Sequence, residues 1–231
     1  AGTDTIVIEG VGNLHSTEYT PIPDRIIAGT YLLAGAMCGG DILIKNVDYA
    51  HIYSLLTKFK DAGFDLNIKD DNIRLRAGRE KKSFGKIDTM PYPGFPTDLQ
   101  AQTLALQCVS NGVCVVTENL FETRFKHVPE LIKMGANIVT KDRTAIVTGV
   151  KDLYGADVSA TDLRAGSALV MAGIYAHGQT TILNVHNIDR GYESIEKVFN
   201  ALGADIKRVW KIFFINLKIK YKNVCINMKN G

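Results

Sequence analysis

The chain has 231 residues, 46% hydrophobic and 22% charged, so it can bury a substantial core and is of the ordinary globular class, not the disordered one. Its formal net charge of +3 comes from the last 22 residues, which carry five Lys and no acid; the rest has 22 basic and 24 acidic residues. A nucleic-acid surface needs clustered Lys and Arg on the folded part, so no nucleic-acid partner is expected.

The first 22 residues precede any complete helix–strand unit. They contain a strand-like segment, Thr5–Val11, with the sequence TIVIEGV. The first unit with a recognisable start opens only at Asp24. We therefore expect residues 1–22 to be the end of a preceding domain.

Three later segments share one pattern: an acidic residue, an apolar helical run that ends at a glycine, and a β-branched strand. The acidic residues are Asp24, Asp98 and Asp162, separated by 74 and 64 positions. Self-similarity at such a spacing indicates a repeated module. The three predicted repeats cover about residues 23–90, 91–155 and 156–209.

A second glycine in each repeat follows a second apolar helical run. These glycines are Gly63, Gly135 and Gly203, 37 to 41 positions after the aspartate of the same repeat. A glycine directly past a helix is typical of a left-handed C-cap. Each repeat is therefore predicted as helix, strand, helix, strand, strand. In the second repeat these are a helix from about Asp98, the strand Val113–Thr117, a helix from about His127, and the strands Asn137–Lys141 and Ala145–Val150.

The first helix of each repeat is apolar on nearly every face, as in LLAGAM, LALQCV and ALVMAGI. A helix of this kind is buried on all sides. Repeats placed about a common axis would pack these helices together inside and put their sheets outside. An open doubly wound sheet is less favoured, because the strands come in consecutive pairs and no GxGxxG or GxxxxGKS loop is present.

Residues 210–231 match none of the repeats and are rich in Lys, Asn and Ile. We interpret them as an atypical tail. The third repeat is expected either to lack its final strand or to use Lys211–Lys220 as a surrogate.

The cysteines and histidines show no spacing typical of a metal site, since CxxC, HxxxH and HExxH are all absent. We therefore expect no metal and no cofactor. Cys38, Cys108 and Cys114 lie in apolar helical runs or a strand, which favours buried, reduced thiols. No signal peptide or membrane-spanning segment is recognised, so a cytoplasmic protein without a membrane partner is the simplest interpretation.

Asp98 follows the loop PYPGFP, whose three prolines and one glycine indicate a rigid, specific backbone. Thr97 and Gln100 are predicted to form a T-x-x-Q capping box that places Asp98 at the first helical position. There the helix dipole would keep its carboxylate ionised. A lone aspartate would usually only stabilise its helix, but the loop before it favours a chemical role.

Arg124, Arg164 and Arg190 each fall near the entrance of a helix. Singly, each would usually be a surface arginine or part of an ion pair. If the repeats share an axis, these entrances meet on one face, where arginines and helix N-termini together bind carboxylate or phosphate groups. The expected ligand is a small dianion or a sugar nucleotide.

Four segments carry a specific family resemblance: PYPGFPTDLQAQ, TENLFETRFKHVPELIKMGA, ATDLRAGSALVMAG and HNIDRGYESIEKVFNALGA. Over residues 1–209 the chain resembles the C-terminal half of the UDP-N-acetylglucosamine 1-carboxyvinyltransferases, which begin peptidoglycan synthesis. The resemblance implies an α/β fold of the EPSP synthase type, an inside-out barrel domain of threefold βαβαββ repeats. It also implies transfer of the enolpyruvyl group of phosphoenolpyruvate to the 3′-hydroxyl of UDP-N-acetylglucosamine, with release of phosphate and without a metal.

The resemblance implies roles for single residues as well. Asp98 matches an aspartate that contacts the accepting hydroxyl and is a candidate general base. Leu120 matches a position whose backbone contacts the nucleotide sugar, and Arg190 and Arg164 match arginines near phosphoenolpyruvate. The further active-site positions that the chain matches are Arg124 and Asp162.

The family's general-acid cysteine belongs to the other domain, and no cysteine of this chain lies in a matching motif. The isolated chain is therefore expected to be an inactive C-terminal fragment that lacks its N-terminal domain. Two alternatives stay open. One is the related 3-phosphoshikimate 1-carboxyvinyltransferase activity, which FPTDLQAQ and HNIDRGYE disfavour; the other is a non-catalytic nucleotide-sugar-binding module.

Overall fold

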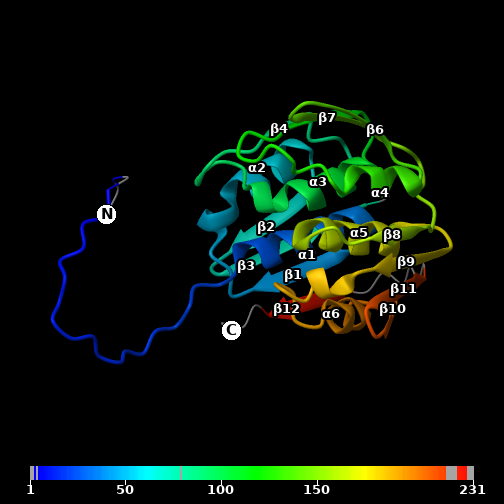
Figure 1. Cartoon of the computed structure of the whole chain (residues 1–231). Coiled ribbons are helices and arrows are strands. Elements are labelled where there is room, and N and C mark those ends of the chain that lie inside the picture. The colour runs from blue at the N-terminus through cyan, green and yellow to red at the C-terminus, as the bar shows by residue number, and fades with distance from the viewer. Residues whose placement is uncertain (1–2, 4, 79, 217–222, 228–231) are drawn as a thin grey trace.

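A computed structural model describes residues 3, 5–78, 80–216 and 223–227 of the chain. Three helix–sheet units follow one another along it (Figure 1). Each unit has a largely buried first helix, a second helix and a four-stranded sheet. The first helices are α1 (Arg25–Cys38), α3 (Gln100–Gln107) and α5 (Leu163–Tyr175).

These three first helices pack against one another in the interior of the molecule, with the sheets around them (Figure 1). All eight residues of α3 are buried, as expected for a helix without a solvent face. Small residues permit the close packing. A Cβ added to Gly29 of α1 would lie 2.6 Å from Cδ1 of Leu99, and one added to Gly166 of α5 would lie 2.4 Å from Cγ1 of Ile188.

The three sheets share one strand order. An edge strand runs parallel to the strand that follows the first helix, and an antiparallel pair completes the sheet. The first sheet is β12 (Asn223–Asn227), β1 (Asp41–Lys45), β3 (Asn72–Arg76) and β2 (Asp65–Lys69). The second is β4 (Lys86–Asp88), β5 (Val113–Thr117), β7 (Thr144–Thr148) and β6 (Asn137–Lys141). The third is β8 (Asp157–Ser159), β9 (Gln179–Leu183), β11 (Ile212–Asn216) and β10 (Asp205–Val209).

The second helix of each unit ends where the sequence indicates. Gly63, Gly135 and Gly203 have φ values of +79°, +94° and +104°, so all three adopt the predicted left-handed conformation, which glycine reaches without steric cost. The helices before them are α2 (Tyr53–Asp61), α4 (Val128–Lys133) and α6 (Ile195–Ala201). Short 3-10 turns accompany the helices: η1 (Tyr49–Ile52), η2 (Thr97–Leu99) and η3 (Val185–Asn187).

The tail contributes to two sheets. Strand β11 completes the third sheet, so the surrogate strand expected within Lys211–Lys220 is found over Ile212–Asn216; positions 217–220 lie outside the described residues. Strand β12 pairs in parallel with β1. There it takes the edge position that β4 and β8, the segments before α3 and α5, hold in the other sheets.

The strand predicted at Thr5–Val11 is not formed. These residues extend away from the folded body (Figure 1) and expose Ile6, Val7 and Ile8 by 82–86%. A strand exists only where its backbone groups pair with a neighbouring strand, and the segment joins none of the three sheets of the described residues. Alternating apolar residues alone therefore do not make it a strand.

The thiols whose surroundings are described agree with the expectation of reduced cysteines. Cys38, Cys108 and Cys114 are free, and burial raises the pKa of Cys38 to about 12 and that of Cys114 to about 11. The side chain of Cys225 lies outside the described part of the structure. None of the helices in the described residues is both long enough and apolar enough to cross a membrane.

Candidate active site

Asp98 lies between two arginines from different parts of the chain. Its Oδ1 accepts a hydrogen bond from Nη2 of Arg124 at 2.5 Å, and its Oδ2 accepts one from Nη2 of Arg164 at 3.2 Å. Asp98 is in η2 at the entrance of α3, Arg124 follows β5, and Arg164 is in the first turn of α5. The structure thus brings three of the predicted site residues together.

The PYPGFP loop presents Asp98 on a fixed backbone. The Met90 N–H donates to the Phe95 carbonyl at 2.9 Å, and the Gly94 N–H donates to the Pro91 carbonyl at 2.7 Å. A Cβ at position 94 would lie 2.4 Å from Cβ of Met90, so only glycine fits. The loop is therefore closed on itself immediately before the turn that carries Asp98.

The predicted capping box is wrong. The Thr97 hydroxyl donates to Oε2 of Glu118 at 2.8 Å, and no side chain caps η2 or α3. The Gln100 side chain is fully buried, and its amide atoms have no hydrogen-bond partner among the described residues. The Glu118 carboxylate is a stronger partner for the Thr97 hydroxyl than a neutral group would be, because charge-assisted hydrogen bonds are about twice as strong as neutral ones.

Glu118 is a buried residue of the candidate site that the sequence did not point to. Its carboxylate is 1% exposed and accepts four hydrogen bonds. The donors are the hydroxyls of Thr89 and Thr97, both at 2.8 Å, and the N–H groups of Leu120 at 3.0 Å and Phe121 at 3.2 Å. Glu118 therefore ties the segment before Asp98 to the turn that carries Leu120. The available signal was an acid at the end of an apolar strand, directly before the Asn119–Leu120 turn.

Glu118 also restricts what Leu120 can do. Because the Leu120 N–H is already donated to Oε1 of Glu118, only the carbonyl of Leu120 can serve as a backbone contact for a ligand. The Leu120 side chain is 39% exposed, so this turn reaches the surface.

The two arginines have different surroundings. Arg124 stacks over the ring of Phe121, with Cζ 4.9 Å from the ring centroid. Burial lowers the pKa of Arg164, but Tyr192 and Asp98 outweigh it, and the pKa of Arg164 lies above its ordinary value. The site therefore holds two cations against one carboxylate, a balance that favours an anionic ligand.

Asp162 and Arg190, also predicted site residues, make no side-chain hydrogen bond to Asp98 among the described residues. Asp162 is the N-cap of α5, where its Oδ1 accepts from the backbone N–H groups of Arg164 and Ala165, both at 2.9 Å. Arg190 is exposed and forms no hydrogen bond or ion pair with the described residues. Its neighbour Gly191 packs on Leu163, since a Cβ there would lie 2.9 Å from Cδ2 of Leu163. Arg190 is therefore held beside the entrance of α5 with its guanidinium uncommitted.

His127 gives this region a pH dependence. It is 1% exposed, and burial lowers its pKa to about 4, with smaller opposing effects of Asp162, which raises it, and Arg124, which lowers it. Below the ordinary pKa of about 6.5 the unfolded chain takes up a proton that the folded chain still excludes. Stability is therefore lost as the pH falls from 6.5 towards 4.

We expect the free energy of unfolding to decrease by about 2 kcal/mol between pH 7 and pH 5 because of His127. Urea unfolding at the two pH values measures this decrease. The variant His127→Gln has no titrating ring and should lack it. A decrease of the same size in the variant would assign the effect to other groups.

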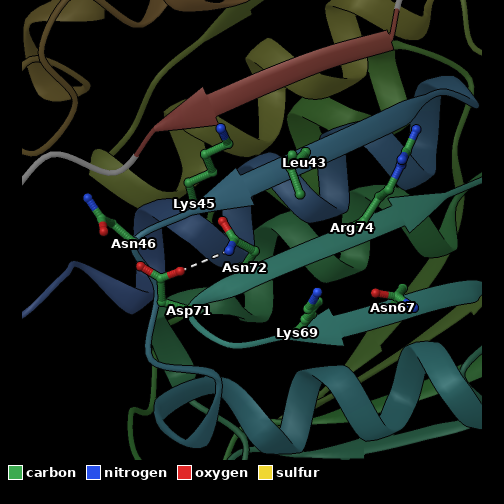
Figure 2. Close-up of a pocket in the computed structure, with 8 residues that line it drawn as sticks. All are labelled: Leu43, Lys45, Asn46, Asn67, Lys69, Asp71, Asn72 and Arg74. Carbon is green, nitrogen blue, oxygen red and sulfur yellow. Dashed lines mark hydrogen bonds between the residues drawn. The ribbon is translucent and has the colours of Figure 1, made fainter.

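A separate hollow lies on the outer face of the first sheet (Figure 2). Its volume is about 510 Å³, and Lys45, Lys69 and Arg74 line it. Arg74 is already paired with Asp41, at 2.7 and 2.6 Å. None of the predicted site residues lines this pocket, so it is distinct from the Asp98 cluster.

The sequence matches the family model described as EPSP synthase (3-phosphoshikimate 1-carboxyvinyltransferase) over residues 1–199. The chain belongs to this family. Solved members of the EPSP synthase fold agree with the α/β architecture expected above. The enolpyruvyl transferase NikO from Streptomyces tendae is 25% identical, with a TM-score of 0.74 over 84% of this chain and 45% of that protein. EPSP synthase from Acinetobacter baumannii is 16% identical, with a TM-score of 0.72 over 92% of this chain and 50% of that protein.

Curated proteins that are similar in sequence have a more specific enzyme name than the structures above. UDP-N-acetylglucosamine 1-carboxyvinyltransferase 2 from Caldanaerobacter subterraneus subsp. tengcongensis is 48% identical over 209 residues, which are 90% of this chain and 50% of the relative. UDP-N-acetylglucosamine 1-carboxyvinyltransferase from Geobacter metallireducens is 50% identical with the same coverage. This member of the EPSP synthase family therefore spans about half the length of the curated relatives it matches.

Proposed function

We propose that this chain provides one side of the active site of an enolpyruvyl transferase that joins phosphoenolpyruvate to the 3′-hydroxyl of UDP-N-acetylglucosamine. The observation that carries the proposal is the Asp98–Arg124–Arg164 cluster at the entrances of α3 and α5. Relatives 48–50% identical to the chain, which carry this enzyme name, support the choice of substrate. The reaction would be the first committed step of peptidoglycan synthesis, in the cytoplasm.

The cluster suits the addition step of this reaction. The 3′-hydroxyl oxygen would bond to C2 of phosphoenolpyruvate while its proton passes to the carboxylate of Asp98. The proton that C3 gains would come from a group outside this cluster. Loss of a C3 proton and departure of phosphate from C2 would then restore the enolpyruvyl double bond.

The arginines would hold the acceptor in place. A carboxylate or phosphate of phosphoenolpyruvate can take over the hydrogen bonds that Arg124 and Arg164 now give to Asp98, because all three groups are anionic acceptors. The exchange would leave Asp98 free to receive the hydroxyl proton. Arg190, uncommitted beside α5, would supply a further cation for the phosphate.

Ligand binding to the 231-residue chain tests the proposal directly. We expect saturation-transfer NMR to detect UDP-N-acetylglucosamine, and Arg164→Gln to weaken phosphoenolpyruvate binding about tenfold, the usual worth of a charge-assisted hydrogen bond. Arg143→Gln is the matched control, because Arg143 pairs at 3.0 Å with the exposed Glu122. The chain alone is expected to release no phosphate.

Two outcomes would change the assignment. Contacts to 3-phosphoshikimate without any to UDP-N-acetylglucosamine would favour the shikimate-pathway reaction. Equal phosphoenolpyruvate binding by Arg164→Gln and the unsubstituted chain would remove the arginine cluster from the site.

A further inference from the structure

The loop of residues 91–96, directly before the turn that carries Asp98, rests on the first unit. The hydroxyl of Ser54, in the first turn of α2, donates to the Gly94 carbonyl at 3.2 Å, and this hydrogen bond is partly buried. The Gly94 N–H donates to the Pro91 carbonyl inside the loop. Both backbone groups of Gly94 are therefore paired, one within the loop and one with the first unit.

Tyr92 attaches the same loop to the first unit at a second point. Cζ of Arg25, the first residue of α1, lies 5.4 Å from the centroid of the Tyr92 ring, an arrangement in which a cation is attracted to an aromatic face. Nη1 of Arg25 donates to the His51 carbonyl at 3.2 Å, and the His51 ring meets the Tyr92 ring edge-on, with centroids 6.3 Å apart. The side chain of Tyr92 is largely exposed, so these neighbours, rather than burial, hold its ring in place.

Leu99, the residue after Asp98, is attached to the first unit as well. It is fully buried and packs on Gly29 of α1. A Cβ at position 29 would also lie 3.3 Å from Cδ2 of Leu55 in α2, so Leu99 packs where α1 and α2 meet. The first unit therefore holds the chain on both sides of Asp98.

Asp98 depends on these attachments once a ligand binds. Among the described residues its carboxylate pairs with Arg124 and Arg164, which belong to the second and third units. A substrate anion that takes these two arginines removes both ion pairs. The contacts of Ser54 and Arg25 with the loop involve neither the carboxylate nor the two arginines, so they stay in place.

We propose that Arg25 and Ser54 are positioning residues that hold the loop of residues 91–96, and with it Asp98, at the entrance of α3. Three of the six loop residues are prolines without an N–H group, so the backbone of the loop attaches to its surroundings mainly through carbonyls. The inference rests on the proposed function for its purpose, which is to keep the carboxylate within reach of the accepting hydroxyl. The first unit thereby supports a cluster whose three charged groups come from the other two units.

The test compares Ser54→Ala and Arg25→Met with two control variants. Thr57→Val removes a hydroxyl from the same helix, one that donates at 3.0 Å to the Tyr53 carbonyl of that helix. Arg76→Met removes a guanidinium that pairs with two acids of the first sheet. The first readout is the pair of backbone amide resonances of residues 94 and 98 in ¹H–¹⁵N spectra of the 231-residue chain. The second is steady-state kinetics in an enzyme of the relatives' length that carries this sequence.

We expect Ser54→Ala and Arg25→Met to shift or broaden the amide resonances of Gly94 and Asp98, and the controls to leave them unchanged. In the enzyme, each of the two should lower kcat about tenfold, since a displacement of about 1 Å costs up to about 10²-fold. KM for UDP-N-acetylglucosamine should stay within about twofold, because the contacts act on the transition state and not on uniform binding. Ser54→Thr, which keeps the hydroxyl, should retain both the resonances and kcat.

Unchanged resonances of Gly94 and Asp98 in Ser54→Ala and Arg25→Met, or equal changes in the controls, would overturn the positioning role. Changed resonances with an unchanged kcat would overturn it too, and would leave the two residues as structural supports of the loop. If the unsubstituted enzyme transfers no enolpyruvyl group, the proposed function fails, while the resonances still decide whether Arg25 and Ser54 hold Asp98.

Discussion

On the proposed function, replacing Asp98 with Asn should lower kcat at least about 10²-fold in an enzyme of the relatives' length that carries this sequence, the usual contribution of a positioned general base. An amide cannot accept the proton of the attacking hydroxyl. The fold should persist, because Asp98 is partly exposed and caps neither η2 nor α3. Steady-state kinetics and the midpoint of thermal unfolding together measure both effects.

The same variant should bind phosphoenolpyruvate at least as tightly as the unsubstituted protein. Asp98 pairs with Arg124 and Arg164, so a ligand that takes these arginines must break two ion pairs, which the Asp98→Asn variant no longer has. A large loss of kcat with undiminished affinity would therefore separate a catalytic role from a role in substrate binding.

Asp24 offers the matched control for Asp98. It opens the first unit as Asp98 opens the second, but among the residues that the structure describes its Oδ1 accepts only the backbone N–H groups of Ile26 and Ile27, at 2.7 and 3.0 Å. Asn caps helices as well as Asp does, so Asp24→Asn should leave kcat within about twofold. An unchanged kcat in Asp98→Asn would reduce Asp98 to a partner in an ion-pair cluster.

Replacing Glu118 with Ala should lower the free energy of unfolding by about 4 kcal/mol, because four donors lose their acceptor in a buried place and each orphaned group costs about 1–3 kcal/mol before relaxation and water entry. The affected donors come from two segments, at Thr89 and Thr97 and at Leu120 and Phe121. Urea unfolding at pH 7 provides the measurement.

Glu122 is the control for Glu118. It lies four residues further on, its side chain is 83% exposed, and its single ion pair among the described residues is with Arg143. Exposed pairs of this kind contribute about 0–1 kcal/mol, so Glu122→Ala should hardly change stability. Similar losses from the two variants would show that the Glu118 network does not hold the turn together.

The fold was largely predictable because its signals are local. The glycines at 63, 135 and 203 follow apolar helical runs, and the left-handed backbone they need is a property of the residue itself. The predicted bounds of the strands Val113–Thr117 and Asn137–Lys141 agree with the observed ones, because β-branched, alternating residues are also a local signal. Thr5–Val11 failed because a strand depends on a partner elsewhere in the chain.

The candidate site was predictable only in part. The proximity of Asp98 and Arg164 follows from the repeats, since the entrances of the equivalent helices α3 and α5 meet on one face, and Arg124 joins them from the loop after β5. The contacts beneath them connect residues far apart in sequence, such as Thr30 with Tyr192, 162 positions away. No local pattern can reveal such a pair.

The sequence by itself determined the threefold repeat, the buried first helices and the acidic residue at each helix entrance, because hydrophobic periodicity and glycine caps act within about 20 residues. Only the tertiary structure decided which polar atoms pair. The Thr97 hydroxyl donates to Glu118 and does not cap a helix as predicted, and β12 pairs with the edge of β1. Both outcomes follow from the need of buried donors and acceptors for partners, which packing supplies from any distance along the chain.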